Sequence, residues 1–319
     1  MINEMKTSLV ITVFNEEKTI ERLLASLSKQ TKKPEEIIIV DGGSTDNTVV
    51  EIEEWRMENG ELSIKILVKK GATIAQGRNL GIREAEREII AMTDAGCWVY
   101  PDWFEKITVP FKDKEIEIVA GFYKMTGETA FQKCLACYLG VLPEKLNSSN
   151  FMPSARSMAF KKEIWKKVGG FNEKLERAGE DTLFNYQAKK IGSKFVTAKE
   201  ALVDWEMPKT WKEAIKKFYF YAKGDGQISI KPHNLKIISI YLRYLLGLGL
   251  LIFGGLKGLW VLGVLGGLIV VYLLWAVGKN YRFVKSWQAV FILPALQIVS
   301  DLAVMAGFLV GSLKGVNET

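Results

Sequence analysis

The sequence predicts an α/β domain built on a mostly parallel sheet with helices on both faces, followed by an amphipathic helix and about three transmembrane helices. Two apolar runs, residues 8–14 and 36–40, each end in carboxylate and amide side chains. Strands that alternate with helices are typical of parallel sheets, which bind ligands at the carboxyl edge. Three long apolar stretches follow residue 235, and they predict the membrane part.

The elements of the first domain follow from hydrophobic periodicity and from turn residues. Strands are expected at residues 8–14, 36–40, 63–68 and 88–93, and helices at 16–30, 47–58, 75–85 and 181–191. In the first helix, Ile20, Leu23, Leu24 and Leu27 fall on one face. Strands that alternate with helices in this way predict βαβ units and a sheet covered on both faces.

The membrane helices are expected at residues 237–255, 259–277 and 287–313, each close to the ~20 residues that cross a hydrocarbon core. The basic loop 278–286 is expected on the cytoplasmic side. Residues 1–7 are polar and too short to hold the apolar core of a signal peptide. We therefore expect a multi-pass protein of the cell membrane with a cytoplasmic amino-terminal domain.

Two charged residues lie within these spans. Arg243 is in the first and Asp301 is in the third. Intramembrane charges usually face a partner or a polar path, so the two side chains are candidates to pair with each other or to contact a lipid phosphate. The alternative for Arg243 is that its long side chain reaches the interface.

Between the two parts, residues 207–234 form an expected amphipathic segment, which sets the domain boundaries at 1–206, 207–234 and 235–319. Trp211, Ile215, Phe218 and Ala222 share one helical face while lysines lie elsewhere. A basic helix with an aromatic apolar face is typical of the lipid headgroup layer. The alternative is an amphipathic helix that packs on the first domain.

The counts of charged residues, histidine and cysteine limit the kinds of ligand and active site that we expect. The chain has 43 Lys and Arg against 36 Asp and Glu, and this net charge of +7 suits an anionic ligand or membrane surface, or serves solubility and topology alone. The single histidine argues against multi-His metal sites and a Ser-His-Asp triad. Cys134 and Cys137 are expected to be buried thiols, since an odd total of three argues against a disulfide framework.

Four short stretches in order carry a family resemblance: T-V-F-N-E-E at 12–17, V-D-G-G-S-T-D-N-T at 40–48, T-D-A-G at 93–96 and G-E-D at 179–181. Together they resemble inverting nucleotide-sugar glycosyltransferases of family 2, which have the GT-A fold. The resemblance covers roughly residues 8–222, and the three trailing spans resemble membrane-anchored members. A dinucleotide-binding Rossmann domain would instead carry a glycine-rich fingerprint after its first strand, where this chain has Asn15-Glu16-Glu17.

The resemblance implies a donor site for a nucleotide-diphosphate sugar, with a preference for uridine. The implied donor-binding residues are Thr12, Phe14, Asn15, Glu16, Asp41, Gly43, Ser44, Arg78, Asp94 and Ala95. Asp41 to Asn47 also fits a plain turn and helix cap, and both interpretations can hold together. For Arg78 the alternative is a solvent-facing helix residue.

A divalent cation, Mn or Mg, is the implied cofactor, held at Asp94. The family's Asp-x-Asp motif has Gly96 at its third position here, and Asp204 is a weaker candidate for a second ligand. Such ions accept phosphates and waters as most of their ligands, so one protein carboxylate can suffice.

Asp181 is the candidate general base, at the start of a helix where free amides and the dipole stabilise negative charge. Glu180 would position the acceptor or support the loop, and simple helix capping is the alternative for the pair. Arg156 and Ser157 lie in a stretch that resembles the family's pocket-lining strand, which makes them candidates for phosphate or acceptor contact.

The expected reaction is transfer of a single sugar, with inversion, to a membrane- or lipid-linked saccharide. The Gln-x-x-Arg-Trp signature of polymerising members is absent from residues 211–226. A polyprenyl- or dolichyl-phosphate sugar synthase is the alternative activity, and a pseudoenzyme scaffold that binds nucleotide sugar is the non-enzymatic one. The lipid bilayer is an expected partner, nucleic acid is not, and the sequence leaves a homo-oligomer open.

Overall fold

The structure is a computed structural model that describes residues 6–60, 62–148 and 151–315, and the chain divides into two compact units. The first comprises Met1–Met125 and Pro143–Glu206, and the second comprises Thr126–Leu142 and Met207–Thr319. The division after Glu206 falls where the sequence predicts a domain boundary. The segment Thr126–Leu142 differs from that prediction, because it belongs to the second unit.

The first unit is built on one sheet whose described strands follow the order β3-β2-β1-β4-β7-β6-β8-β5. Strands β1 to β4 pair in parallel, whereas β7 is antiparallel to both β4 and β6, and β5 is antiparallel to β8. The strands are β1 (Thr7–Val13), β2 (Glu36–Asp41), β3 (Ile64–Val68), β4 (Ile89–Asp94), β5 (Cys97–Val99), β6 (Ile118–Thr126), β7 (Met158–Lys161) and β8 (Phe195–Glu206).

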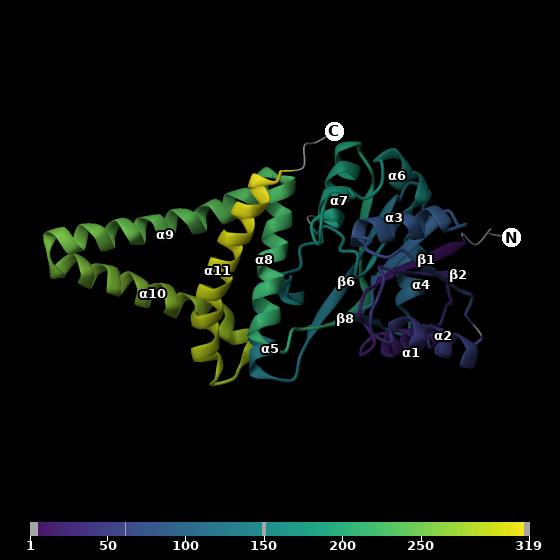
Figure 1. The fold of residues 1–319 in the computed structure, drawn as a ribbon, viewed down its shortest axis with the longest axis horizontal. Helices are drawn as coiled ribbons and strands as arrows, with labels where there is room; N and C mark the ends of the chain where they lie inside the picture. The colour runs from purple at the N-terminus through teal and green to yellow at the C-terminus, as the bar shows by residue number, and fades with distance from the viewer. Residues whose placement is uncertain (1–5, 61, 149–150, 316–319) are drawn as a thin grey trace. The chain divides into compact units, whose positions relative to one another are not determined.

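Helices cover both faces of this sheet (Figure 1). They are α1 (Ile20–Ser28), α2 (Thr48–Glu58), α3 (Ile74–Glu84), α4 (Trp103–Thr108), α6 (Lys162–Lys167) and α7 (Glu180–Lys190), with 3₁₀ turns at Val109–Lys112 and Pro143–Lys145. Right-handed crossovers put α1 and α2 on one face and α3 on the other, because the chain reverses direction across the sheet after β3. The expected apolar face of α1 is buried. The helix begins at Ile20, because the preceding residues form a loop.

Helix α3 lies unusually close to the sheet because two glycines face it. A β-carbon on Gly81 would lie 2.6 Å from Val10 Cγ1 and 3.1 Å from Val40 Cγ2. A β-carbon on Gly77 would lie 3.0 Å from Thr12 Cγ2. Ordinary carbon contacts are about 3.5–4.0 Å, so the two glycines allow α3 to settle onto β1 and β2.

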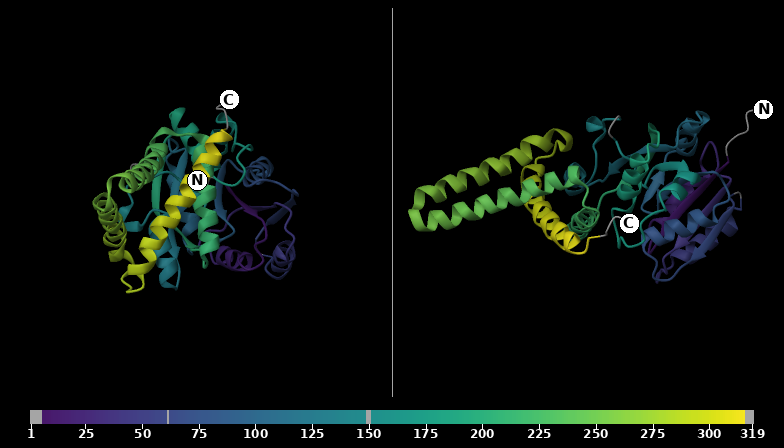
Figure 2. Two further views of the ribbon diagram at one scale, coloured as in Figure 1. Left: turned by 60° about the vertical axis from the view of Figure 1, so that its left-hand side comes forward. Right: turned by 90° about the horizontal axis from the view of Figure 1, so that it is seen from above.

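The second unit is helical. Its elements are α5 (Ala130–Leu139), α8 (Trp211–Ile228), α9 (Lys231–Lys257), α10 (Leu259–Val284) and α11 (Ala289–Leu313). Figures 1 and 2 show α9 and α10 as a long hairpin and α11 beside α8. Three segments are long and apolar enough to cross a membrane, Asn234–Leu256, Leu259–Val284 and Ala289–Leu313. The expected loop at 278–286 is mostly helix, because α10 continues to Val284.

Helix α8 packs tightly on α11 through small residues. A β-carbon on Gly307 would lie 2.1 Å from the carbonyl oxygen of Tyr219, and one on Gly311 would lie 2.1 Å from that of Lys223. Phe218 and Ala222, from the expected membrane-facing side of α8, are buried. Trp211 remains 39% exposed. The helix is therefore an integral part of the helical unit, and only the amino-terminal end of its aromatic face is open.

A polar cluster lies in the middle of the three apolar helices. Asp301 on α11 is 3% exposed and accepts hydrogen bonds from Tyr272 on α10, from Tyr244 on α9 and from Gln297 one turn away, the last at 3.0 Å. The Arg243 guanidinium lies 5.0 Å from the centre of the Tyr272 ring. Of the options for these two charges, direct pairing is not seen among the described residues, because Tyr272 contacts both Arg243 and Asp301.

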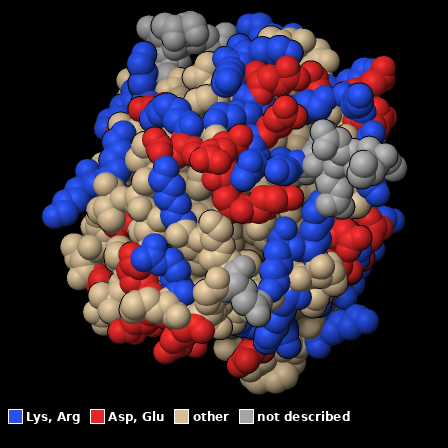
Figure 3. Space-filling view, turned by 90° about the vertical axis from the view of Figure 1, so that its right-hand side faces the viewer, with Lys and Arg blue, Asp and Glu red and all other residues tan. Residues whose placement is uncertain are grey.

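The exposed face of the first unit in Figure 3 mixes the two signs of charge, with Lys and Arg interspersed among Asp and Glu.

Candidate functional site

The turn after β2 is organised by Asp41, the last residue of the strand. Its carboxylate is 1% exposed and accepts the backbone N–H of Gly43 at 2.8 Å and that of Ser44 at 3.0 Å, together with the Ser44 hydroxyl. Gly43 has φ of +96°, a conformation that favours glycine. The turn-forming role foreseen for Asp41 is therefore present, and its oxygens are largely engaged within the turn.

Hydrogen bonds that involve side chains connect the loop after β1 to the loop after β2. The backbone N–H of Asn15 donates to Ser44 Oγ at 2.8 Å, and Asn15 Oδ1 accepts the N–H of Thr45 at 2.8 Å. Asn15 itself has φ of +56°. The N–H of Glu16 donates to the Thr48 hydroxyl at 2.7 Å. These bonds hold the predicted donor-binding segments side by side at the carboxyl edge of the sheet.

Phe14 is an exposed aromatic residue among the predicted donor-site residues that follow β1. It is 56% exposed, and its ring lies 3.4 Å from the position of a β-carbon on Gly42. An aromatic ring left open above a glycine offers a face on which a planar base can stack.

Strand register brings the other predicted residues to the same edge. Thr12 on β1 is the direct partner of Asp94 on β4, and Val13 is the partner of Asp41 on β2. Because neighbouring strands are about 4.8 Å apart, the backbones of Asp41 and Asp94 lie roughly 10 Å apart on either side of β1. The strand order reverses between β1 and β4. Ligands of open α/β sheets bind at such a switch point.

Arg78 on α3 joins this edge to a distant part of the chain. Its Nη2 pairs with Asp94 Oδ1 at 2.9 Å, and its Nη1 pairs with the Glu180 carboxylate at the start of α7. Arg78 is 2% exposed and Glu180 is 4% exposed. The alternative of a solvent-facing Arg78 is wrong, because the guanidinium is buried and both of its ends are paired. Contact of Arg78 with the nucleotide stays a prediction.

Burial affects the pKa of both Arg78 and Glu180. Burial raises the pKa of the Glu180 carboxyl, and the charge of Arg78 only partly opposes that rise. For Arg78, burial alone would lower the pKa, but the negative charges of Glu180 and Asp94 outweigh it and the pKa is raised. Buried charged groups with specific partners are common at functional sites.

Asn79, the neighbour of Arg78, fixes α3 to the turn after α6. Its amide nitrogen donates to Phe171 O at 2.8 Å and to Glu173 Oε1 at 2.9 Å. Its amide oxygen accepts from Trp165 Nε1 and from Phe171 N–H, both at 2.9 Å. Asn79 was not predicted as a site residue, although an amide directly after a candidate arginine in a glycine-rich helix was a signal.

Asp181 lies beside Glu180 in the first turn of α7 and is partly exposed. One carboxylate oxygen accepts the N–H of Ala155 at 3.2 Å, and the other accepts the N–H of Thr182 at 2.8 Å. Two backbone donors from different segments hold this carboxylate in one orientation, which a proton acceptor requires. Asp181 thus stands next to the Arg78 network without being paired to the arginine.

The two candidates for acceptor contact have different environments. The Arg156 guanidinium lies 3.9 Å from the centre of the Trp205 ring and donates to Ser154 Oγ at 2.8 Å. Ser157 is 1% exposed, and its hydroxyl accepts from Trp103 Nε1 and donates to the carbonyl of Ala201. These contacts give Ser157 a structural position in the core, whereas Arg156 is half-buried at the edge of an aromatic cluster.

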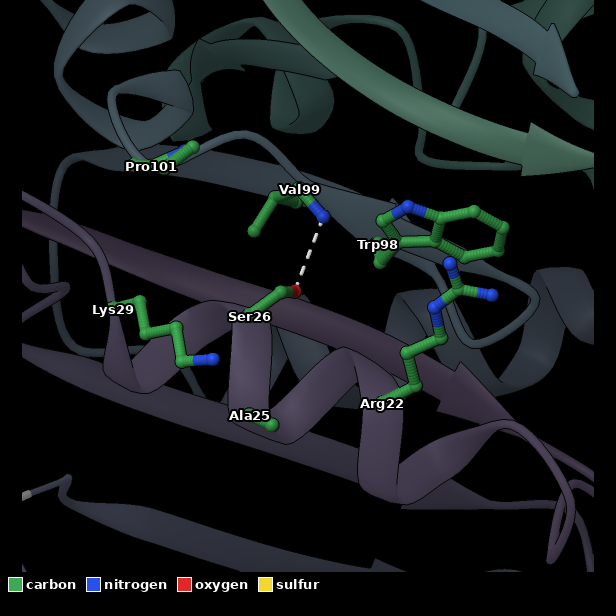
Figure 4. A pocket seen from close by; sticks show the side chains of 7 residues that line it. All are labelled: Arg22, Ala25, Ser26, Lys29, Trp98, Val99 and Pro101. Carbon is green, nitrogen blue, oxygen red and sulfur yellow. Dashed lines mark hydrogen bonds between the residues drawn. The ribbon is translucent and has the colours of Figure 1, made fainter.

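Two pockets of the first unit are lined by other residues. One, of about 230 Å³, lies between α1 and β5, where the Arg22 guanidinium stacks 3.3 Å from the centre of the Trp98 ring and Val99 N–H donates to Ser26 Oγ at 3.1 Å (Figure 4). Trp98 Nε1 also donates to Asp204 at 2.9 Å. Asp204 is therefore engaged with β5, which does not favour it as a second metal ligand.

A metal site here would have few protein ligands. Among residues 6–60, 62–148 and 151–315, no three His, Cys, Asp or Glu side chains are grouped to hold a metal ion. The site nonetheless suits a divalent cation, because Asp94 and Asp181 lie around Arg78 together with Glu180, and carboxylate oxygens are ligands that such ions prefer. A β-carbon on Gly96 would meet nothing within 4 Å, so the third motif position is open space. The three cysteines are free thiols.

Comparison with known proteins agrees with this geometry. The family model for glycosyl transferase family 2 matches residues 8–164, the segment that carries β1, β2, α3 and β4. Residues 8–164 therefore form a family 2 glycosyltransferase domain. Curated glycosyltransferases are among its relatives, so the chain is a glycosyltransferase enzyme.

Individual relatives cover different shares of this glycosyltransferase. Glycosyltransferase AglE of Haloferax volcanii is 24% identical over 226 residues, which are 69% of this chain and 73% of AglE. Three further curated glycosyltransferases, from Bacillus subtilis and Streptococcus pneumoniae, align over 35–38% of their own lengths. The chain thus spans about a third of those proteins.

Solved structures extend the likeness to the whole fold. Mannosyltransferase PcManGT from Pyrobaculum calidifontis, solved with GDP-Man and Mn²⁺, superposes with a TM-score of 0.68 at 19% identity, over 92% of this chain and 86% of PcManGT. TarS 1-349 of S. aureus with UDP-GlcNAc gives a TM-score of 0.53 at 19% identity, over 69% of this chain and 66% of that one. At these identities the comparisons establish the GT-A fold, with three added helices that could span a membrane.

Proposed function

We propose that this glycosyltransferase moves a single sugar, with inversion, from a nucleotide-diphosphate sugar to a membrane- or lipid-linked saccharide, with Asp181 as general base and a divalent cation at Asp94. The observation that carries the proposal is the Arg78 bridge, which brings the Asp94 end of β4 and the Glu180–Asp181 end of α7 together. Donor-side and acceptor-side carboxylates thereby meet at the switch point of one sheet.

Asp181 fits the role of base better than its neighbour. Glu180 is buried and paired to Arg78, so its carboxylate cannot reach an acceptor from that position. Asp181 is partly exposed and held by two backbone N–H groups, which leaves room for a hydroxyl at its open side. In the proposed step the acceptor oxygen bonds to the anomeric carbon, its proton passes to Asp181, and the bond from that carbon to the diphosphate oxygen breaks.

Asp94 would hold the cation together with the donor. When bound, a divalent cation neutralises the charge that develops on the departing diphosphate. Because Asp94 is the one carboxylate offered by the motif, the donor's phosphate oxygens and water would supply most ligands. Arg78, 2.9 Å from Asp94 Oδ1, fixes the orientation of that carboxylate.

The nucleotide is proposed to lie over the loops after β1 and β2, with its base against Phe14 and its ribose near Glu16 and Asp41. PcManGT was solved with a guanosine donor and TarS with a uridine donor, so both bases belong in any donor screen. The uridine preference rests on the motif resemblance alone.

The acceptor class is proposed from the second unit. Three helices of 23 to 26 residues with mean hydropathy of 1.9 to 2.4 would hold the enzyme at a bilayer. An enzyme anchored in this way meets lipid-linked acceptors at high local concentration. The basic end of α10, with Lys279 and Arg282, would face the cytoplasm together with the first unit.

One experiment tests the proposal. The full chain in detergent is incubated with a panel of UDP- and GDP-sugars, with and without Mn²⁺, and nucleotide diphosphate release is measured with water, polyprenyl phosphate or a polyprenyl-diphosphate saccharide as acceptor. We expect Mn²⁺-dependent release that is fastest with the lipid-linked saccharide. Substitution of Asp181→Asn should lower turnover by about 10²–10⁴-fold and leave nucleotide binding intact.

Unchanged turnover in Asp181→Asn would defeat the base assignment. Faster transfer to undecorated polyprenyl phosphate would identify a lipid-phosphate sugar synthase instead. Nucleotide binding without release under every condition would identify a non-catalytic scaffold.

A further inference from the structure

Arg78 occupies a position that its sequence context did not foretell. It belongs to α3, yet its two terminal nitrogens reach a strand end sixteen residues later and a helix start 102 residues later. It is among the largest fully buried side chains of the described chain. A guanidinium presents its donors in a rigid planar fork, so a single arginine can fix the relative position of two carboxylates.

The arginine is itself held in place by neighbours. Asn79 ties the same turn of α3 to Phe171 and Glu173 by hydrogen bonds of 2.8 and 2.9 Å. The ring of Phe171 lies 5.8 Å from the guanidinium carbon of Arg78. Gly77 and Gly81 let the helix approach the sheet closely. The guanidinium therefore has little freedom to follow a ligand.

The cluster is not arranged for stability alone. Arg78 Nε and Glu180 Oε2 are buried and have no hydrogen-bond partner among the described residues. Incompletely satisfied buried charges stabilise a fold less than apolar side chains of the same size would. A buried ion pair of this kind is better explained by the geometry that it imposes.

We infer that Arg78 is a positioning residue, which joins the donor-side carboxylate Asp94 to the Glu180–Asp181 pair and thereby sets where the proposed base stands. This inference rests on the proposed function for its donor side and its base. Arg78 then acts through Asp94 and Glu180 and makes no direct contact with the nucleotide.

The test separates binding from turnover. Arg78→Lys keeps the positive charge but lacks the fork, so it can hold one carboxylate at a time. In the full chain in detergent, we expect the Kd for UDP with Mn²⁺ to change by less than about threefold, whereas kcat for donor hydrolysis falls by about 100-fold, the effect of a misplacement of about 1 Å. Rates are counted per UDP-binding site, which removes any unfolded fraction.

Two further variants act as controls. Arg83→Lys lies on the same helix, where Arg83 is half-exposed and 3.8 Å from Glu173, and it should leave both quantities unchanged. The double variant Arg78→Met/Glu180→Gln removes both buried charges together, so no carboxylate is left buried without its cation. We expect it to bind UDP with Mn²⁺ and to have lost turnover as Arg78→Lys has.

The outcomes distinguish this inference from the function on which it rests. Suppose that Arg78→Lys loses UDP affinity and turnover equally while Asp181→Asn is inactive. That result would overturn the positioning role alone and would indicate that Arg78 contacts the nucleotide directly. Full turnover in the double variant would also overturn it. Full turnover in Asp181→Asn would overturn the base assignment and the positioning role together.

Discussion

The approach of α3 to the sheet can be tested by adding a single carbon. In Gly81→Ala the new methyl group would lie 2.6 Å from Val10 Cγ1 and 3.1 Å from Val40 Cγ2, and both valines are buried on central strands. Relief of the first contact requires a movement of about 1 Å, because carbon atoms pack at about 3.5–4.0 Å. Neither strand can yield easily, so α3 is the element that must move.

The magnitude is a balance of two effects. Alanine is favoured over glycine inside a helix by about 1 kcal/mol. Overpacking of a well-packed core costs about 1–3 kcal/mol, and two short contacts on buried side chains place this site toward the upper end. We expect a net loss of about 1–2 kcal/mol. For a unit of this size that loss lowers the thermal midpoint by about 2–8 °C.

Gly77→Ala provides the matched comparison. Its β-carbon would have one short contact, 3.0 Å from Thr12 Cγ2, so the gain in helix propensity and the packing cost should nearly cancel. The assay is thermal unfolding of the full chain in detergent, followed by donor hydrolysis at 25 °C. Because Arg78 moves with α3, Gly81→Ala should also lose turnover by about tenfold or more. A Gly81→Ala protein as stable and as active as its parent would refute this account of the packing.

Three other predictions concern the second unit. In Gly311→Ala the new methyl would lie 2.1 Å from the backbone oxygen of Lys223, so the thermal midpoint of the protein in detergent should fall. Gly247→Ala, in open space, should leave the midpoint unchanged. Equal midpoints in the two variants would contradict the close contact of α8 with α11. Burial raises the pKa of the Cys134 thiol to about 12, so the thiol is protonated at pH 8. Iodoacetamide should therefore modify Cys134 only after unfolding, as followed by mass spectrometry. Rapid labelling of Cys134 in the native protein would contradict this. Asp301→Asn keeps one oxygen that accepts from its neighbours and places an amide donor where the other oxygen was. It should cost less than about 2 kcal/mol, with donor hydrolysis unchanged. A collapse of turnover would show that the cluster serves catalysis.

Much of the parallel half of the sheet could be predicted from sequence, because its strands are mostly apolar and β2 and β4 each end in an aspartate. Asp41 and Asp94 end β2 and β4, and parallel pairing brings such ends to one edge. The antiparallel strands β6, β7 and β8 gave weaker signals. β7 spans only four residues, and β8 has exposed charges at Lys199 and Glu200 in its middle. Their pairing depends on contacts far apart in the chain, which periodicity does not encode.

The sequence predicted which residues belong to the candidate site, but not which of them pair with one another. Glycine and acidic motifs marked the loops after β1 and β2, yet the burial of Arg78 depends on Glu180, which is 102 residues away. Likewise the hydroxyl of Ser157 looks available in the sequence, and only the fold shows it closed between Trp103 and Ala201. The extension of α10 through basic residues was missed because charge marks the end of a membrane span rather than the end of a helix.

The membership of α5 in the helical unit has a consequence for biosynthesis. Its Tyr138 hydroxyl donates to the Leu293 carbonyl of α11 at 3.0 Å, Gln132 donates to the Met207 carbonyl at 2.8 Å, and the Phe131 ring lies 4.8 Å from that of Trp211. Translation at about 5–20 residues per second delivers α11 roughly ten to thirty seconds after α5. During that interval the apolar side of α5 is without its partners. In a chain truncated at residue 206, the apolar side of α5 would stay permanently without its partners. Such a chain is therefore a poor choice for a water-soluble catalytic fragment.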